Sequence, residues 1–419
     1  MPARHNSVVF EPGHIGALQI KNRLVRSATY ENAATPEGEV SDNLISIYSA
    51  LAKGGAGLII TGICGVYPKA LAPHLMMRVD EDRFIPGLNR LSGAVHKAAP
   101  DSRIMLQLHH PGRQVMDPAM RARLASKLAP AWVAAFQKRP TTATAPEAAP
   151  HIIEPTAPSA LHDTLFDRIP RALRLAEIEE IINAFAEGIR RAEEAGFDGV
   201  QLHAAHGWLL DCFLSPRTNR RDDIYGGSTE NRTRIITEIF RRARKKVSAD
   251  FPILIKFNST DFLPGGIDPD EAVKVARILS ETGFAALEVS GGMWETVTRS
   301  EKELGWPPVL LPESRTGIKS VDQEGYFLDN AQYVRKHVDA AVIAVGGFKS
   351  FSKIEKALTS KAADFISLSR PFIREPDLAN RWRAGDGLDR AACISCNACL
   401  PLADEPLTCR AKSDKKSKA

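Results

Sequence analysis

The chain has 419 residues, of which 44% are hydrophobic and 25% charged, and its formal net charge is +5 at pH 7. This length suffices for one large α/β domain or for two or three smaller domains. The segment 410–419 holds five basic residues and one acidic residue, so it carries +4 of the +5. The remainder is almost neutral, which excludes nucleic acid and membrane surfaces as expected partners and favours a small-molecule substrate.

The sequence contains no apolar segment of the length that a signal peptide or a membrane span requires. We therefore expect a cytoplasmic protein. Its six cysteines agree with this, because Cys64 and Cys212 stand alone and the other four lie close together near residue 400. That pattern is more typical of metal ligation than of the disulfide framework of a secreted protein.

From residue 22 onward, short apolar runs alternate with amphipathic segments. The predicted strands cover residues 22–29, 57–63, 103–108, 199–204, 252–258, 286–291, 341–347 and 364–370. The predicted helices cover residues 42–53, 82–98, 176–195, 230–247, 269–281, 330–336, 352–359 and 375–383. Eight strand and helix units fit a closed (β/α)₈ TIM barrel better than an open doubly wound sheet. A dinucleotide-binding fold would also need a glycine-rich turn after the first strand, where this chain has none.

The alternation is interrupted after the third strand by a proline-rich insertion, residues 111–170. We expect it to form a lid or cap, for which Trp132 and Phe136 provide packing groups, rather than a disordered linker. The expected organisation is a barrel over residues 1–385, a cysteine-containing extension over 386–409 and a basic, disordered tail over 410–419.

In a (β/α)₈ barrel the chemistry takes place where the strands end. The expected strand ends are polar almost throughout: Ser27–Tyr30, Gly62–Cys64, Gln107–His110, His203–Trp208, Lys256–Asn258, Ser290–Gly292, Gly346–Gly347 and Ser369–Arg370. Gly346, Gly347 and Arg370 suit a phosphate group, because bare backbone and a guanidinium group both bind phosphate oxygens. Gln107 and Lys256 suit a heterocycle that gains negative charge, such as a reduced isoalloxazine. The alternatives are a tight turn with a surface arginine and ordinary structural hydrogen bonds.

His203 and His206 occupy the end of the fourth strand, and their side chains converge only if the backbone leaves strand geometry between them. They could be metal ligands, with Asp211 or His110 as a third ligand, a donor pair for a carbonyl or phenolate oxygen, or hydrogen-bonded core residues. No regular metal-ligand spacing is present, so the donor pair ranks above zinc.

Four segments resemble the Old Yellow Enzyme family of FMN-dependent oxidoreductases: NRLVRSATYE, LQLHHPGR, the long run from HAAHG to YGGSTENR, and SLSRPFIREPDLANRW. The resemblance covers Phe10 to about Arg383. It implies an FMN-binding barrel in which NAD(P)H reduces the flavin, and flavin N5 then passes hydride to the β-carbon of an α,β-unsaturated carbonyl compound.

The resemblance also implies roles for individual residues. His203 and His206 would hold the substrate oxygen, Gln107 the flavin pyrimidine edge, and Gly347 and Arg370 the phosphate. The expected cofactor-binding set is Ser27, Ala28, Thr29, Gly62, Gln107, Lys256, Gly346, Gly347, Ser369 and Arg370.

Three positions depart from the family pattern. Trp208 replaces the tyrosine that many members use as a proton donor, and an indole offers no usable proton. Tyr30, where many members have Thr or Cys, or water could act as the donor instead. Lys256 replaces an arginine, which keeps the charge near flavin N1 but loses the planar fork.

Cys393, Cys396, Cys399 and Cys409 have the spacing Cys-x₂-Cys-x₂-Cys-x₉-Cys. This spacing resembles the cluster loop of trimethylamine dehydrogenase and 2,4-dienoyl-CoA reductase. We expect a [4Fe–4S] cluster ahead of zinc, which would need a separate redox partner protein unless it is structural or vestigial.

The main hypothesis is an FMN-dependent ene-reductase that forms a homo-oligomer. The alternatives are an amine dehydrogenase-like flavoenzyme, a dienoyl or enoyl thioester reductase that passes electrons through the cluster, a flavin-free zinc hydrolase, and a catalytically silent binding protein.

Overall fold

The computed structural model describes residues 4, 6–68, 75–115, 154–400 and 405–411. Eight parallel strands form a closed barrel, which confirms the expected (β/α)₈ architecture. They are β3 (Leu24–Arg26), β4 (Leu58–Gly65), β6 (Arg103–His109), β9 (Gly199–Ala204), β10 (Ile253–Asn258), β11 (Ala286–Ser290), β12 (Ala341–Ala344) and β13 (Phe365–Leu368). The ring closes because β3 pairs with both β13 and β4.

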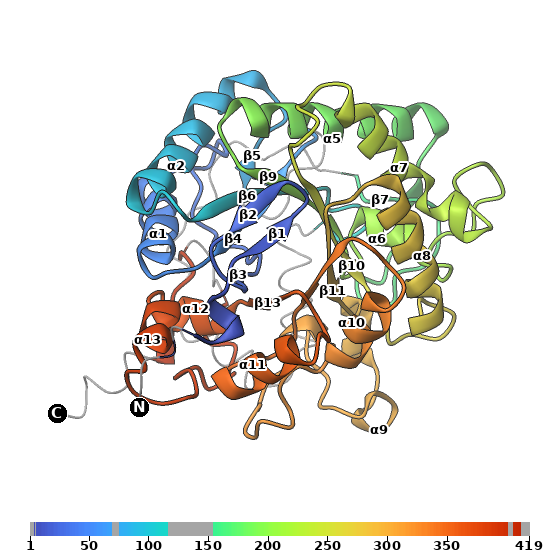
Figure 1. Cartoon of the computed structure of the whole chain (residues 1–419). Helices are drawn as coiled ribbons and strands as arrows, with labels where there is room; N and C mark the ends of the chain where they lie inside the picture. The colour runs from blue at the N-terminus through green and yellow to red at the C-terminus, as the bar shows by residue number, and fades with distance from the viewer. Residues whose placement is uncertain (1–3, 5, 69–74, 116–153, 401–404, 412–419) are drawn as a thin grey trace.

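Helices surround the barrel (Figure 1), and every predicted helix is present. They are α1 (Asp42–Lys53), α2 (Ile85–Ala98), α5 (Leu175–Glu194), α7 (Thr229–Arg244), α8 (Pro269–Thr282), α10 (Leu328–Arg335), α11 (Phe351–Thr359) and α13 (Leu378–Ala384). Three short helices were not predicted: α6 (Leu209–Leu214), α9 (Glu301–Leu304) and α12 (Arg370–Arg374). Each has too few residues for a clear helical period.

Local chemistry explains where the helices begin and end. In α8 the side chain of Asp268 accepts a hydrogen bond from the backbone N–H of Glu271, and Pro269 occupies the first turn, where its missing N–H costs nothing. The helix ends at Gly283, whose φ of 110° favours glycine. In α5 the buried side chains recur three and four residues apart, which places one face of the helix against the barrel.

The barrel separates two apolar cores. Between strands and helices lies the larger one, to which Leu106, Leu202 and Phe257 belong. Inside the barrel is a smaller cluster that includes Leu58, Ile60, Met105, Leu254, Ile343 and Phe365. Successive strand residues face opposite sides, so most strands contribute to both cores, whereas β9 contributes apolar residues to the outer core alone.

A hairpin that the sequence analysis missed belongs to the inner cluster. It consists of β1 (Gly13–Ile15) and β2 (Leu18–Ile20), which pair antiparallel, and Figure 1 shows it lying across the strands. Ile15 and Ile20 are fully buried with the inner cluster. The hairpin therefore closes the end of the barrel at which the strands begin. Strands of three residues are too short to give a recognisable alternation.

The predicted insertion is described only at its edges, and Trp132 and Phe136 lie outside the described residues, as does most of the predicted tail. Within residues 154–174, β7 (Thr156–Ala157) pairs parallel with β8 (Arg171–Ala172). Leu165 and Phe166 pack against Trp208, at the strand-end face. The lid stays a prediction, and its described edge lies beside the expected site.

The sequence predicts no membrane-spanning segment. Within the parts of the chain that the structure describes, no helix is long and apolar enough to cross a bilayer.

Candidate active site at the strand ends

A buried chain of amide and carboxylate groups links β6, β9 and β11 inside the barrel, below the ends of these strands. Gln107 Nε2 donates to Gln201 Oε1 at 2.7 Å, and Gln201 Nε2 donates to Glu288 Oε2 at 2.8 Å. Gln107 and Gln201 are register partners on neighbouring strands. The side chain of Gln107 is thereby fixed in orientation, as a residue that reads a heterocycle edge must be.

Lys256 completes this network from β10. Its Nζ lies 3.1 Å from Glu288 Oε1 and donates to Ser27 Oγ at 2.9 Å, while Ser27 Oγ donates to Glu288 Oε1 at 2.9 Å. Lys256 is 4% exposed and Glu288 is fully buried. We call Gln107, Gln201, Glu288, Ser27 and Lys256 the polar floor. Because Glu288 pairs with Lys256, the cation predicted from the sequence is compensated by a carboxylate that the sequence analysis missed.

The sequence contained only a weak indication of Gln201 and Glu288, the two residues of the polar floor that were not predicted. Gln201 precedes His203 by two positions, so both face the barrel interior. Glu288 is a single acid within an apolar strand. The local pattern alone does not show whether its side chain faces the barrel interior or the helices. Only the register, which sets Glu288 opposite Lys256, shows that the two charges meet.

The two predicted histidines lie together above the end of β9, with ring centroids 5.2 Å apart. His206 has a φ of 65°, so the backbone does leave strand geometry between them. A positive φ is uncommon outside glycine, and such strained residues tend to cluster at functional sites. His206 Nε2 shares a hydrogen bond of 2.7 Å with Ser290 Oγ, and the buried Nδ1 of His203 has no hydrogen-bond partner among the described residues.

Both histidines are neutral at pH 7. Burial, with the nearby His206, His109 and Lys256, holds the pKa of His203 well below its usual value. Burial and Lys256 do the same to the pKa of His206. Each ring therefore carries one N–H, which can donate a hydrogen bond to a substrate oxygen.

The zinc interpretation has no support in the described residues. No group of three or more His, Cys, Asp or Glu side chains among them is arranged to hold a metal ion. Asp211 accepts hydrogen bonds from the backbone N–H of Gly207 and from Asn258 Nδ2, at 2.6 and 3.0 Å. His110 Nδ1 accepts from the backbone N–H of Gly112. Both suggested third ligands are thus engaged elsewhere.

Trp208 forms an aromatic wall beside the histidines. Its ring meets His109 edge-on at 4.6 Å and Trp294 at 5.0 Å. The wall is completed by Leu165 and Phe166. Trp208 is 6% exposed, so its main contribution is shape rather than proton transfer.

The glycines and Arg370 lie at the ends of β12 and β13. Gly346 and Gly347 have φ values of 127° and 75°, and a Cβ on Gly347 would come within 2.6 Å of the Tyr326 ring. Only glycine suits this position. Arg370 Nη1 donates to the backbone oxygen of Arg315 at 2.9 Å and to Asn397 Oδ1 at 2.7 Å. Its guanidinium group is therefore held in place by the cysteine-containing extension.

The remaining predicted residues lie along β3, β4 and β13. Thr29 Oγ1 and Ser369 Oγ are hydrogen-bonded at 2.7 Å, which ties the ends of β3 and β13 together, and Ala28 between Ser27 and Thr29 packs on the inner apolar cluster. Gly62 has a structural reason to be glycine, because a Cβ there would lie 1.9 Å from Glu31 Oε2. Its cofactor role stays a prediction.

The hydroxyl group of Tyr30 is engaged in a hydrogen bond beside the extension. Its hydroxyl donates to Asn32 Oδ1 at 2.6 Å, and Asn32 Nδ2 in turn donates to the backbone oxygen of Glu405. The predicted role of Tyr30 as a proton donor is therefore not supported by its hydrogen bonding.

The four cysteines of the extension are all described, and Cys399 is the most deeply buried of them. Burial raises the pKa of the Cys399 thiol to about 11, with nearby Arg370 lowering it and Cys393, Cys409 and Cys396 raising it further. The four thiols thus share one neighbourhood, although they do not converge into a group that could hold a metal ion.

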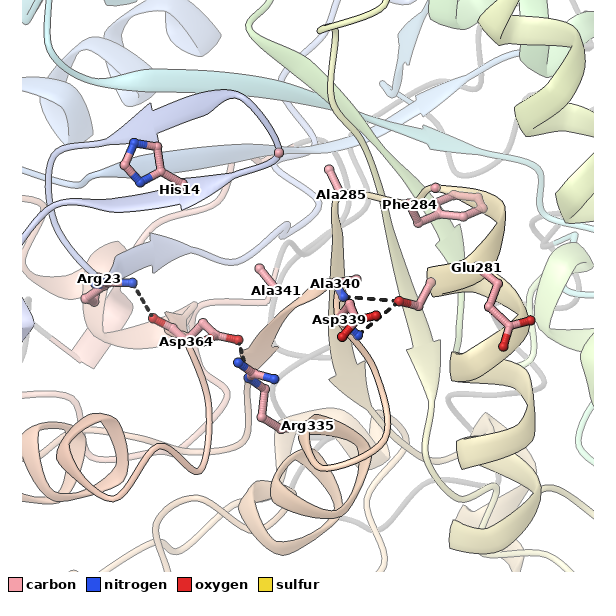
Figure 2. Close-up of a pocket in the computed structure, with 13 residues that line it drawn as sticks. His14, Arg23, Glu281, Phe284, Ala285, Arg335, Asp339, Ala340, Ala341 and Asp364 are labelled. Carbon is pink, nitrogen blue, oxygen red and sulfur yellow. Dashed lines mark hydrogen bonds and ion pairs between the residues drawn. The ribbon is translucent and has the colours of Figure 1, made fainter.

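A cavity of about 520 Å³ lies elsewhere, beside the β1–β2 hairpin and the first residues of β11, β12 and β13 (Figure 2). Its charged groups include Arg335 and Asp364, which pair at 2.8 Å. Because it lies where the strands begin, it is separated from the polar floor by the inner apolar cluster and takes no part in the site.

Comparison with known proteins agrees with this geometry. The model of the NADH:flavin oxidoreductase / NADH oxidase family matches residues 8–388. An NADH oxidase from Thermoanaerobacter brockii is 35% identical over 394 residues, which cover 94% of this chain and 53% of that protein. The chain spans about half the length of the first curated relatives that it matches.

Two solved structures show the same fold. The complex of 2-naphthoyl-CoA reductase with 2-naphthoyl-CoA has a TM-score of 0.79 and 25% identity, over 96% of this chain and 56% of that one. The Old Yellow Enzyme homologue from Zymomonas mobilis has a TM-score of 0.67 and 25% identity, over 92% and 95%.

Glu288→Gln tests the polar floor. The substitution leaves the Lys256 ammonium buried without its carboxylate, so we expect the free energy of unfolding to fall by about 3–5 kcal/mol. Urea unfolding of the FMN-free protein measures it. The matched control is Glu179→Gln, which breaks an exposed ion pair with Arg242 and should cost less than about 1 kcal/mol. Equal losses for the two variants would contradict the account of the floor.

Proposed function

The chain belongs to the NADH:flavin oxidoreductase / NADH oxidase family, and we propose that it uses FMN and NAD(P)H to reduce the C=C bond of an α,β-unsaturated carbonyl compound. The observation that carries the proposal is the pair of neutral histidines beside the polar floor. Donors fixed in this way stabilise the oxygen on which negative charge develops when hydride reaches the β-carbon.

The residues of the site fit FMN. The polar floor offers an oriented amide from Gln107 and a cation from Lys256, both buried, and these match the heteroatom edge of an isoalloxazine. Both hydrogen bonds of Arg370 are donated by Nη1, and Nη2 makes no hydrogen bond to a described residue. Together with the bare backbone of Gly346 and Gly347 it suits a phosphate group. Bound FMN would supply the transfer of hydride from NAD(P)H to the alkene.

The chain's own residues then have distinct tasks. His203 and His206 orient the substrate by its carbonyl oxygen, and the Trp208 wall excludes water from one side of the site. Since both rings are neutral, they stabilise the enolate oxygen by donating hydrogen bonds, not by charge.

The proposal is tested by identifying the flavin of the purified protein and following its absorbance anaerobically. We expect bound FMN that NAD(P)H bleaches and that enones or enoyl thioesters restore to the oxidised form. Protein that binds no FMN would contradict the proposal. Bleaching by amines, with no response to enones, would favour the amine dehydrogenase alternative.

Arg370→Ala tests the phosphate site separately from the flavin ring. Losing a charge-assisted hydrogen bond of about 1.5–3 kcal/mol should weaken FMN binding about 10- to 150-fold. Riboflavin lacks the phosphate, so its affinity should be unchanged. Quenching of flavin fluorescence measures both constants. If the variant weakened both flavins equally, Arg370 would act on the structure of the site and not on the phosphate.

We also propose that the four cysteines of the extension bind a [4Fe–4S] cluster, for which their thiols must move closer together than in the arrangement described above. Their spacing and the mutual influence of their thiols support this, as do the left-handed residues Ser395 and Asn397, which allow a tight loop. Anaerobically purified protein should contain iron and acid-labile sulfide, and Cys396→Ser should lower both. A stable, metal-free preparation would contradict the proposal.

A further inference from the structure

An acid that the sequence analysis did not consider lies opposite His206. Glu313 belongs to a short 3₁₀ turn, Pro312–Ser314, in the connection between β11 and α10. Its Oε1 lies 3.9 Å from His206 Nδ1. Its Oε2 is buried and has no hydrogen-bond partner among the described residues. The side chain as a whole is 21% exposed.

The position of Glu313 is fixed from behind. Tyr326, which packs against the glycines that end β12, donates its hydroxyl hydrogen to the backbone oxygen of Glu313 at 2.6 Å. The turn is therefore anchored through its backbone, and the carboxyl group is left for contacts on the side of His206.

The other acids near the histidines are already committed. Glu288 is bonded to Lys256, Ser27 and Gln201 within the polar floor. Glu295 forms a buried ion pair with Arg113 at 2.6 Å. These carboxylates accept hydrogen bonds as anions, so they cannot also give up a proton.

Asp211 shares two features with Glu313: its Oδ1 is buried without a hydrogen-bond partner among the described residues, and burial and the neighbouring Asp261 raise its pKa well above the usual value. Its Oδ2, however, accepts hydrogen bonds from the backbone N–H of Gly207 and from Asn258 Nδ2, which hold the carboxyl group beside the start of α6.

Trp208 has no usable proton, and the hydroxyl hydrogen of Tyr30 is donated to Asn32. Of the two acids with an unpartnered buried oxygen among the described residues, Glu313 is the one whose carboxyl group lies 3.9 Å from His206 Nδ1.

The spacing between Glu313 and His206 suits a ligand. At 3.9 Å the two groups are too far apart for a direct hydrogen bond, which needs about 2.7–3.2 Å. A substrate oxygen that accepts from His206 would lie beside the Glu313 carboxyl. The α-carbon is separated from that oxygen by the carbonyl carbon alone, so it lies within reach of the same carboxyl group.

We propose that Glu313 is the proton donor of this site and replaces the tyrosine whose position Trp208 occupies. The inference rests on the proposed function. Hydride adds to the β-carbon, the C=C π bond breaks, and an enolate forms whose oxygen is held by the histidines. The O–H bond of Glu313 then breaks and a C–H bond forms at the α-carbon. The carboxylate regains its proton from water through the exposed part of the side chain.

The electrostatic surroundings keep this acid protonated near neutral pH. Burial raises the pKa of Glu313 to about 7, while its own backbone N–H, Lys256 and Arg370 oppose the rise. The titratable groups that face it are His206, which is neutral, these two cations, and Tyr326, whose pKa is raised by burial so that its hydroxyl stays protonated. The acid form is present below pH 7 and is lost as the pH rises above it, so alkene reduction should slow there about tenfold per pH unit.

The experiment separates the two halves of the reaction in FMN-loaded protein. In Glu313→Gln, bleaching of the flavin by NAD(P)H should keep its rate, while reoxidation by an enone should slow about 10²- to 10⁴-fold, the usual contribution of a general acid. Glu313→Asp, which keeps an acid, should recover part of the rate and the fall above neutral pH. Glu301→Gln, on the same connection but exposed, should match the wild-type protein.

A readout independent of turnover is the infrared carboxyl band of FMN-loaded protein. The difference between wild-type protein and Glu313→Gln should contain a protonated C=O band that disappears as the pH rises through about 7. Normal reoxidation by Glu313→Gln, or a band that disappears near the ordinary pKa of a glutamate, would overturn the inference and leave the proposed function standing. Wild-type protein whose bleached flavin no enone reoxidises would overturn both.

Discussion

The buried ion pair between Lys256 and Glu288 is the constraint on which the site depends. Two charges inside a barrel are tolerated only when they are paired and hydrogen-bonded, and here Ser27 and Gln201 supply the additional bonds. The floor joins β3, β6, β9, β10 and β11, and the inner residues of β3, β6, β10 and β11 nearer the hairpin are apolar. The barrel interior thus changes from apolar to polar along its axis, and the chemistry is confined to the polar end.

The other groups of the site all lie at the polar end of the barrel. The left-handed His206 brings the second imidazole over the strand ends, Trp208 walls the site, and the connection after β11 carries Glu313 to His206. Strands place the groups that bind and orient, while a connecting segment supplies the acid. This division agrees with the usual arrangement of (β/α)₈ barrels, in which the strands form the scaffold and the connections after them supply functional groups.

The sequence was sufficient for the barrel, because each strand is an apolar run that ends in polar residues and each long helix has a clear period. It also placed Gln107, Lys256 and the two histidines together near those ends, as the structure has them, while their roles stay predictions. It could not reveal that Glu288 faces Lys256, since that depends on register between strands. Nor could it place Glu313 beside His206, because no local pattern encodes which side chain a long connection brings near a strand end. The β1–β2 hairpin was not predicted, because its three-residue strands are too short to show an alternating pattern.

The central claim is that FMN binds at the polar floor. A crystal structure of the FMN complex tests it most directly. We predict the isoalloxazine ring across the strand ends, with its pyrimidine edge on Gln107 and Lys256, its phosphate at Gly347 and Arg370, and Glu313 and His206 facing the open side of the ring. FMN bound at the opposite end of the barrel, or at the strand ends with no contact to Lys256 or Gln107, would contradict the account.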